Sequence, residues 1–250
     1  MGALEGKKAI VTGASSGIGA AIAQALAHEG ALVAVGARRL DRLTDLGEGF
    51  IALELDVTDP ESSASFVASA VNRLEGLDIL VNNAGLALGR DFFDASTEED
   101  EEVVLETNVH GLIRMTRLSL PHLADGGHVV NIGSVAGRQA YDRGALYVTS
   151  KYAVRGFTYA LREDLLGRPI HLTTVDPGLV ETNFSRVRFR GDEEAAAKVY
   201  QGVEPLRPED IAECVLFAVT RPPHVNVDEL VVKALAQSSG GRILRGTQEP

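Results

Sequence analysis

Cysteine is nearly absent from this chain, because among 250 residues only Cys214 carries a thiol. A single thiol excludes an intramolecular disulfide and any metal cluster built on several cysteines. The six histidines show no metal-ligand spacing, so no metal site is predicted. The acidic run at residues 98–102 follows the capping pair Ser96 and Thr97 and is interpreted as a solvated helix face.

Long apolar runs and an excess of positive charge are missing as well. No apolar run reaches the ~18 residues that a membrane span needs, and Met1 to Lys8 contain no apolar signal-peptide core. The formal net charge of −11 argues against a general binder of nucleic acid or anionic membranes. We therefore expect a cytoplasmic protein with no nucleic-acid partner and no membrane partner.

Short apolar runs alternate with longer amphipathic stretches along the whole chain. Continuous apolar runs are typical of parallel strands covered by helices on both faces. This pattern predicts an α/β fold, a doubly wound parallel sheet of the Rossmann type with about seven strands, in a single catalytic domain spanning residues 1–250. Strands are expected at residues 8–11, 32–36, 50–55, 79–81, 128–132, 171–175 and 229–232. Helices are expected at residues 17–29, 40–46, 61–75, 97–123, 145–166 and 208–220.

Residues 184–202 form the one long interruption of this pattern, just after the sixth strand, and they are expected to include a short alanine-rich helix. Long loops in compact domains are usually functional or disordered, so we expect a substrate lid here. Arg186, Arg188 and Arg190 alternate, and an extended lid would aim all three in one direction, where one could meet a substrate carboxylate. The alternative is a solvated loop whose charges keep it in water. The tail from Ser238 is expected to be loosely held.

A glycine-rich turn lies between the first strand and the first helix. Its glycines permit a tight turn and let backbone amides approach a pyrophosphate at the helix N-terminus. The spacing is G-x-x-x-G-x-G, and no G-K-[ST] follows, which excludes a P-loop for ATP. The candidate cofactor-binding residues of the turn are Gly13, Ser15, Ser16, Gly17, Ile18 and Gly19.

The second strand ends in Ala37, Arg38 and Arg39. A fold that prefers NAD commonly has an acid there for the ribose 2′-hydroxyl. Two arginines suit a 2′-phosphate instead, so NADP (NADPH) is favoured over NAD. The alternative is that these arginines simply begin a solvated helix.

Tyr147 and Lys151 stand four residues apart on a predicted helix, so their side chains share one face. A free tyrosine has a pKa near 10, and a neighbouring ammonium stabilises the phenolate. Ser134 lies 13 residues before Tyr147, at the end of an apolar strand. These three side chains are the candidate acid–base site.

Together these residues resemble the short-chain dehydrogenase/reductase family, of the compact single-domain kind. The family features run in order from Thr12 to about Thr182 and include Asp56-Val57, Asn82-Asn83-Ala84-Gly85, Asn108 and Pro177-Gly178. Gly133 stands where a serine is frequent, but Ser134 keeps its distance from Tyr147.

The resemblance implies a role for each catalytic residue. Ser134 would hydrogen-bond the substrate carbonyl or hydroxyl, and Tyr147 would be the general acid or base. Lys151 would lower the pKa of the tyrosine and bind the nicotinamide ribose. Asn108 would hold a water that links Lys151 to a proton relay.

The resemblance also extends the cofactor site. Asp56 and Val57 would border the adenine. The residues that would back the adenine or shape the nicotinamide site are Asn83, Ala84, Gly85, Pro177, Gly178, Val180 and Thr182.

The implied activity is an NADP-dependent oxidoreductase, an alcohol dehydrogenase or carbonyl reductase. It would transfer a hydride between the nicotinamide and a small carbonyl or alcohol substrate. The segment from Val227 to Val232 is similar to a subgroup acting on hydroxy acids and small carbonyl compounds. Two alternatives stay open, an NAD(P)-dependent epimerase or dehydratase and a non-catalytic NADP-sensing protein.

The expected helices at residues 97–123 and 145–166 carry apolar residues on more than one side. One face must cover the sheet, so the second needs a partner or an intramolecular core. The resemblance favours pairing of these helices in a homo-oligomer, either a dimer or a homotetramer.

Overall fold

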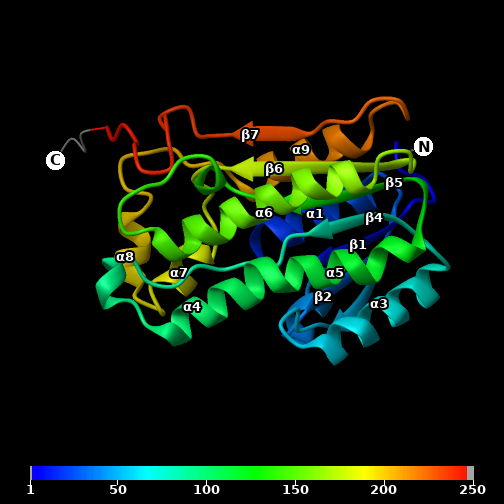
Figure 1. Cartoon of the computed structure of the whole chain (residues 1–250), viewed down its shortest axis with the longest axis horizontal. Coiled ribbons are helices and arrows are strands. Elements are labelled where there is room, and N and C mark those ends of the chain that lie inside the picture. Colours follow the sequence, from blue (N-terminus) through cyan, green and yellow to red (C-terminus); the bar gives the residue numbers. More distant parts are fainter. Residues whose placement is uncertain (1, 247–250) are drawn as a thin grey trace.

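The computed structural model describes residues 2–246, in which seven parallel strands form one sheet in the order β3-β2-β1-β4-β5-β6-β7 (Figure 1). This arrangement confirms the predicted doubly wound α/β fold. The strands are β1 (Lys8–Thr12), β2 (Leu32–Ala37), β3 (Phe50–Glu54), β4 (Leu77–Asn82), β5 (Leu123–Ile132), β6 (Ile170–Pro177) and β7 (Glu229–Val232).

The helices alternate with these strands and begin and end close to the expected positions. They are α1 (Gly17–His28), α2 (Leu40–Thr44), α3 (Pro60–Leu74), α4 (Glu98–Leu105), α5 (Leu112–Ser119), α6 (Ala145–Asp164), α7 (Phe184–Arg188), α8 (Glu193–Lys198) and α9 (Pro208–Val219). A π-helical turn, η2 (Glu106–Gly111), joins α4 to α5. In the described part of the chain, no helix combines the length and the apolar character needed to cross a membrane.

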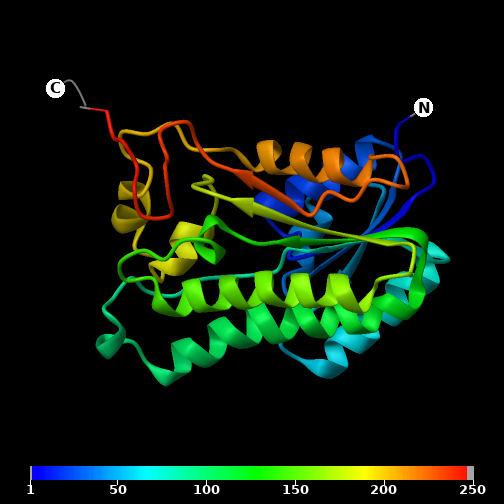
Figure 2. The same ribbon diagram turned by 45° about the horizontal axis from the view of Figure 1, so that its top comes forward.

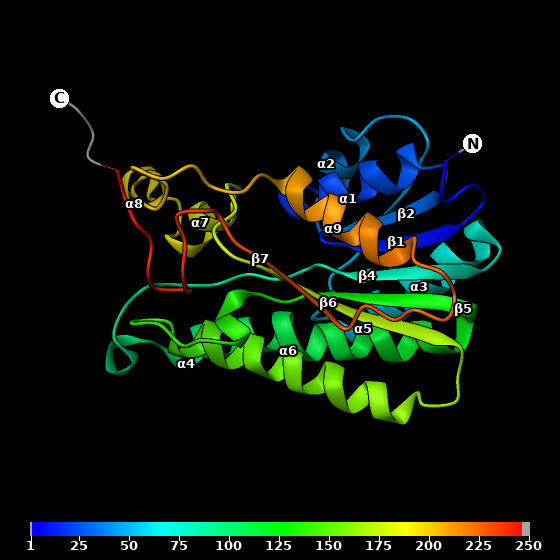
Figure 3. The same ribbon diagram turned by 90° about the horizontal axis from the view of Figure 1, so that it is seen from above.

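Helices cover both faces of the sheet, with α1 and α9 on one side and α3, α5 and α6 on the other (Figure 3). Neighbouring residues of β1 serve opposite faces, because Ile10 packs under α3 and α5 while Val11 packs under α1 and α9. Both side chains are fully buried, and each such burial contributes roughly 1.5–3 kcal/mol. The apolar runs therefore reflect strands that are buried on two sides.

The acidic run begins α4 as expected, since the Thr97 hydroxyl accepts a hydrogen bond from the Asp100 amide at 3.2 Å. The interpretation of the whole run as solvated is wrong for Asp100, which is buried. Its carboxylate pairs with Arg190 at 2.6 Å, across 90 residues of sequence. Sequence periodicity alone cannot reveal a partner that distant.

Strand order reverses at β1, whose neighbours are β2 on one side and β4 on the other. Open α/β sheets bind ligands at the carboxyl ends of the strands beside such a switch point. The helices α7 and α8 lie beyond that edge, on the left of Figure 2. The fold thus brings the segment after β6 next to the expected cofactor site.

The expectation that the arginines lie on an extended segment is wrong, because Phe184–Arg188 form the helix α7, whereas α8 is the short alanine-rich helix expected in this segment. Side chains two residues apart on a helix point in nearly opposite directions, about 200° around the axis. Arg186, Arg188 and Arg190 consequently do not share one direction.

The end of the described chain contacts this segment. The Gly246 amide donates to the Gly202 carbonyl at 2.8 Å, and Arg245 donates to the Val199 carbonyl at 3.0 Å. The remainder of the tail, residues 247–250, lies outside the described residues. That the tail from Ser238 is loosely held stays a prediction.

Candidate active site

A cavity of about 950 Å³ opens at the carboxyl ends of the strands. Every residue predicted for the site lines it except Asn108, which lies behind it. The predicted cofactor residues around the cavity are Gly13, Ser15, Ser16, Gly17, Ile18, Gly19, Arg38, Arg39, Asp56, Val57, Asn83, Ala84, Gly85, Pro177, Gly178, Val180 and Thr182. Ser134, Tyr147 and Lys151 line the same cavity.

The glycine-rich turn is locked to the loop after β4. The Asn83 side-chain amide donates to the Thr12 carbonyl at 2.9 Å, and the Thr12 hydroxyl accepts from the Asn83 amide at 3.0 Å. A Cβ on Gly19 would lie 2.3 Å from the Asn83 amide nitrogen, so only glycine fits there. Gly13 has a φ of +66°, which also favours glycine. This close-packed turn lines the cavity at the N-terminus of α1.

Positive charge gathers where β2 ends. Within residues 2–246, neither Arg38 nor Arg39 has a carboxylate partner within 4.0 Å, and Arg39 donates to the Ser15 hydroxyl at 3.3 Å. Arg42 lines the cavity as well, although it was not among the predicted site residues. Its position as the third arginine after β2 could have indicated a further phosphate-binding residue. Unpaired guanidinium groups at this point suit a phosphate.

Other lining residues were not predicted individually. Thr58 follows Asp56 and Val57, Thr107 precedes Asn108, and Asn183 precedes the segment predicted as a substrate lid, to which Phe184 and Val187 belong. No motif marked them, because their position follows from how the loops fold back over the cavity.

The catalytic candidates converge from β5 and α6. Ser134 follows β5, and its hydroxyl donates to the Pro177 carbonyl at 3.5 Å while accepting from the Ala136 amide at 3.1 Å. Tyr147 and Lys151 lie one turn apart on α6, and the Lys151 ammonium is 5.8 Å from the Tyr147 ring centroid. The Lys151 ammonium donates to the Ile132 carbonyl at 2.9 Å.

Burial dominates the electrostatics of both α6 side chains. It lowers the pKa of Lys151 to about 8, opposed by the negative charge of Asp176. It raises the pKa of Tyr147, opposed by the Arg188 guanidinium and the Ser134 hydroxyl. Arg188, whose Cζ lies 5.0 Å from the Tyr147 ring centroid, is thus a second cation beside Tyr147, in addition to Lys151.

Asn108 is buried in the π-helical turn η2 and is held on both sides of its amide. Its Oδ1 accepts from the Leu86 amide at 2.8 Å, and its Nδ2 donates to the Leu86 carbonyl at 2.8 Å and the Ser150 hydroxyl at 3.0 Å. Single π-helical turns inside α-helices frequently occur at functional sites. Asn108 thus fixes the loop after β4 against α6, next to Lys151.

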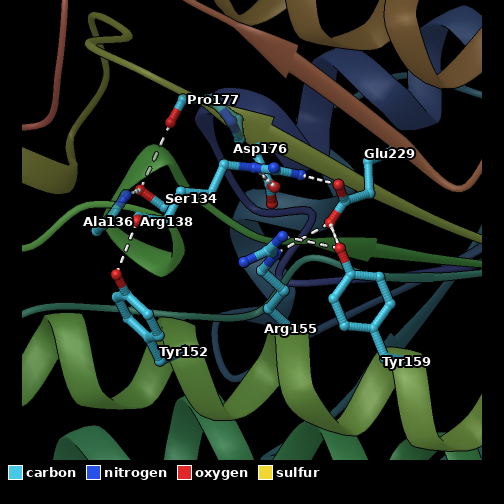
Figure 4. Close-up of polar contacts among 9 residues, drawn as sticks. All are labelled: Ser134, Ala136, Arg138, Tyr152, Arg155, Tyr159, Asp176, Pro177 and Glu229. Carbon is cyan, nitrogen blue, oxygen red and sulfur yellow. Dashed lines mark hydrogen bonds and ion pairs between the residues drawn. The ribbon is translucent and has the colours of Figure 1, made fainter.

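A network of charged residues lies behind Ser134 and Lys151 (Figure 4). Arg138 pairs with the Asp176 carboxylate at 2.7 Å and also with Glu229, which accepts from Arg155 at 3.0 Å and from the Tyr159 hydroxyl at 2.6 Å. A Cβ on residue 133 would lie 1.9 Å from the Asp176 Oδ1 atom. The glycine at position 133, where the family often has serine, therefore makes room for a buried carboxylate.

The network stabilises the charge of Glu229 but not, on balance, that of Asp176. Burial acts to raise the pKa of Glu229, but hydrogen bonds from Arg138, Tyr159 and Arg155 outweigh it and lower the pKa to about 2. Burial raises the pKa of Asp176, and Arg138 only partly opposes that rise. The described residues contain no cluster of three His, Cys, Asp or Glu side chains suited to a metal ion.

Comparisons with known proteins agree with this geometry. Residues 7–193 match the family described as short chain dehydrogenase. The chain is 39% identical to the NADP-dependent 3-hydroxy acid dehydrogenase of Schizosaccharomyces pombe, over 98% of this chain and 99% of that protein. It is 41% identical to the NADP-dependent 3-hydroxy acid dehydrogenase YdfG of Salmonella typhi, over 93% of this chain and 96% of that protein.

A solved structure described as the closed form of serine dehydrogenase complexed with NADP+ matches with a TM-score of 0.89 and 39% identity. The match covers 96% of this chain and 99% of that one. Serine dehydrogenase from Escherichia coli matches with a TM-score of 0.79 and 36% identity, over 92% of this chain and 99% of that one.

Proposed function

This chain belongs to the short-chain dehydrogenase family, and we propose that it is an NADP-dependent oxidoreductase that interconverts a 3-hydroxy acid and the corresponding 3-oxo acid. The observation that carries the proposal is the placement of Ser134, Tyr147 and Lys151 on the same cavity as the glycine-rich turn. The epimerase, dehydratase and sensing alternatives are not favoured, because the relatives that match nearly the whole chain are named dehydrogenases.

The cavity residues fit the pyrophosphate and the 2′-phosphate of NADP. Gly13 and Gly19 let the glycine-rich turn pack against the β4 loop, since a Cβ at either position would meet that loop within 3 Å, and such a turn before a helix N-terminus suits a pyrophosphate. Arg38 and Arg39 offer charged donors to a 2′-phosphate. When bound, the nicotinamide of NADP supplies or accepts the hydride.

Protons move through the chain's own residues. In reduction the Tyr147 phenol gives its proton to the carbonyl oxygen, and in oxidation its phenolate takes the proton of the hydroxyl. The Ser134 hydroxyl holds the same substrate oxygen. Lys151, with a pKa of about 8, keeps a positive charge beside Tyr147 through most of the neutral range and binds the nicotinamide ribose. Asn108 supports a water that links Lys151 to solvent.

The substrate class rests on the named relatives, which are 3-hydroxy acid dehydrogenases over almost their full length. It deepens the broader expectation of an alcohol dehydrogenase or carbonyl reductase. We further propose that residues 184–202 close over the substrate. The match to a structure described as a closed form with NADP+ supports this proposal.

Assembly as a dimer or homotetramer stays a proposal, supported by exposed aromatic residues on α6, Tyr152 and Tyr159. Light scattering at micromolar concentration tests it, and a monomeric mass would contradict it. A cytoplasmic location likewise stays a prediction.

The activity is tested with Tyr147→Phe, which keeps the ring and removes the acid. Oxidation of 3-hydroxybutyrate with NADP+ should fall by about 10²–10⁴-fold, as is typical for lost acid–base catalysis. NADPH binding, followed by fluorescence, should change little. Tyr152→Phe is the matched control, because Tyr152 lies on the same helix and its hydroxyl donates to the Arg138 carbonyl. Near-normal turnover by Tyr147→Phe would refute the assignment.

The cofactor preference is tested by Arg38→Ala. A charge-assisted contact contributes about 1.5–3 kcal/mol, so NADPH affinity should fall roughly tenfold to a hundredfold while NADH affinity changes little. Ala37→Asp should shift preference toward NADH. Equal affinity of the unaltered protein for both cofactors would contradict the preference.

A further inference from the structure

The three arginines of the segment after β6 differ in what they contact. Arg186 pairs with Glu193 at 2.6 Å, and Arg190 pairs with Asp100 at 2.6 Å. Both charges are thus neutralised by carboxylates of the chain itself. These two pairs hold α7 to α8 and to α4, so they have a structural explanation.

Arg188 has no such partner. Within residues 2–246, no carboxylate lies within 4.0 Å of its guanidinium, and its Nε is buried without a hydrogen-bond partner. One Nη donates to the Tyr141 hydroxyl at 2.9 Å. Leaving a buried cationic donor unsatisfied costs free energy, so a structural role alone explains Arg188 poorly.

The unpaired guanidinium of Arg188 lies beside the catalytic Tyr147. Its Cζ lies 5.0 Å from the ring centroid of Tyr147 and 5.3 Å from that of Phe184. Its backbone is fixed to the loop after β4, because the Gly89 amide donates to the Arg188 carbonyl at 2.9 Å. The guanidinium is therefore held next to the catalytic phenol, against Tyr147 and Phe184, which line the cavity, whereas Arg188 itself is not among the lining residues.

An arginine offers a planar pair of donors that matches a carboxylate. In a 3-hydroxy acid the carboxylate is separated from the hydroxyl-bearing carbon by one methylene group. A substrate whose hydroxyl contacts Tyr147 and Ser134 therefore carries its carboxylate only a short distance from that phenol. Arg188 combines a guanidinium 5.0 Å from the Tyr147 ring with a donor that has no partner, whereas Arg186 lines the cavity but is paired with Glu193.

We propose that Arg188 binds the carboxylate of the substrate and selects anionic over neutral substrates. This inference rests on the proposed function for its substrate class. The carboxylate would occupy the unpaired Nε side of the guanidinium, with the Tyr141 hydroxyl holding the other side. The segment containing α7 is then a specificity element, and the ion pairs of Arg186 and Arg190 hold it in place.

The test compares an acid with its ester. Arg188→Met keeps the stem packed on Tyr147 and removes the charge. It should lower kcat/KM for 3-hydroxybutyrate by about 10–100-fold, the effect of losing a charge-assisted contact. For methyl 3-hydroxybutyrate, which has no charge, kcat/KM should fall much less than for the acid, and that smaller loss reflects the removal of a cation beside Tyr147. Arg188→Lys keeps the charge without the planar fork and should retain part of the preference for the acid.

Arg190→Met is the matched control from the same segment. It removes a charge that is already paired, so any loss should be equal for the acid and the ester. Equal losses for acid and ester in Arg188→Met would overturn the carboxylate contact and leave Arg188 as a residue that only supports Tyr147.

A second measurement separates this inference from the proposed function. Butyrate carries the carboxylate but has no hydroxyl to oxidise. In the presence of NADP+, butyrate should raise the Tm of the unaltered protein and leave the Tm of Arg188→Met unchanged. If that difference is seen while 3-hydroxybutyrate is not oxidised, the carboxylate site stands and the proposed reaction fails. An equal Tm response in both proteins overturns the site.

Discussion

The arginines on the two sides of the catalytic residues differ in their partners. Behind Ser134, Arg138 lies between two carboxylates, those of Asp176 and Glu229. In front of Tyr147, Arg188 lies against aromatic rings and a hydroxyl, with no carboxylate among residues 2–246. Both guanidinium groups are partly buried within the same site.

The difference separates stabilisation of the fold from recognition of a ligand. A buried charge that is paired within the chain keeps its neighbours in one arrangement, as Glu229 of β7 does for Arg155 on the helix that carries Tyr147. A buried charge left unpaired costs stability unless a ligand completes it. Unpaired charges beside a catalytic group are therefore where a substrate's own charge is expected.

The largest expected change in unfolding free energy comes from Glu229→Gln, which disrupts the ion pairs around Arg138. The Glu229 pKa lies at about 2 in the folded protein against an ordinary value of 4.5, so its contacts favour the charged form. Because the change removes the carboxylate that Arg138 and Arg155 share, the variant should lose roughly 3 kcal/mol of unfolding free energy at pH 7. Denaturant unfolding measures this loss.

The pH dependence of that loss follows from the sign of the shift. A carboxyl whose folded pKa is depressed contributes its full stability above its unfolded pKa of about 4.5. The contribution is lost as the pH falls from about 4.5 through 2, so the variant and the unaltered protein should converge there. Asp228→Asn, at an exposed neighbouring residue, is the control and should lose less than about 0.5 kcal/mol. A pH-independent gap between the two proteins would contradict the paired role of Glu229.

A smaller loss of unfolding free energy is expected from Gly133→Ala, which places a methyl group against the paired Asp176 carboxylate. The added Cβ would lie 1.9 Å from the Asp176 Oδ1 atom and 2.8 Å from the Thr174 methyl group. Overpacking of this kind costs about 1–3 kcal/mol, and we expect about 2. Combining it with Asp176→Ala should cost less than the sum of the two single changes by at least about 0.5 kcal/mol.

Gly156→Ala provides the opposite control for Gly133→Ala. Gly156 lies within α6 and nothing would contact its Cβ within 4 Å, so alanine there should stabilise the protein by about 0.5–1 kcal/mol. Additive losses in the Gly133 and Asp176 double variant would mean that the glycine does not serve the carboxylate.

Much of the fold and cofactor site could be predicted from sequence because both depend on local patterns. The apolar runs gave all seven strands, since strands buried on two faces carry no polar alternation. The glycine-rich turn was recognisable because tight backbone geometry restricts residue choice, as at Gly19. Tyr147 and Lys151 share a helix face by their spacing alone.

The charge network and the separate roles of the arginines could not be predicted in this way. Asp176 and Gly133 meet across β5 and β6, and Asp100 meets Arg190 across 90 residues, so the pairs are set by tertiary packing. The alternation of the arginines suggested one shared direction only while the segment was assumed to be extended. Its helical conformation gave Arg188 a different environment from Arg186 and Arg190.

The smallest expected effect is the stability change of Arg188→Met, and it tests the unpaired side directly. The variant loses a hydrogen bond to Tyr141 and contacts with two rings, but it also removes a buried charge that no carboxylate balances. Because these terms oppose each other, unfolding free energy should stay within about 1 kcal/mol of the unaltered protein. A loss as large as that of Glu229→Gln would show that Arg188 serves the fold as Arg138 does.

With butyrate at about 100 times its Kd in the presence of NADP+, the unaltered protein should gain about 2.7 kcal/mol relative to the variant. Unfolding free energies measured with and without butyrate therefore distinguish an arginine that stabilises the fold from one that binds the substrate carboxylate.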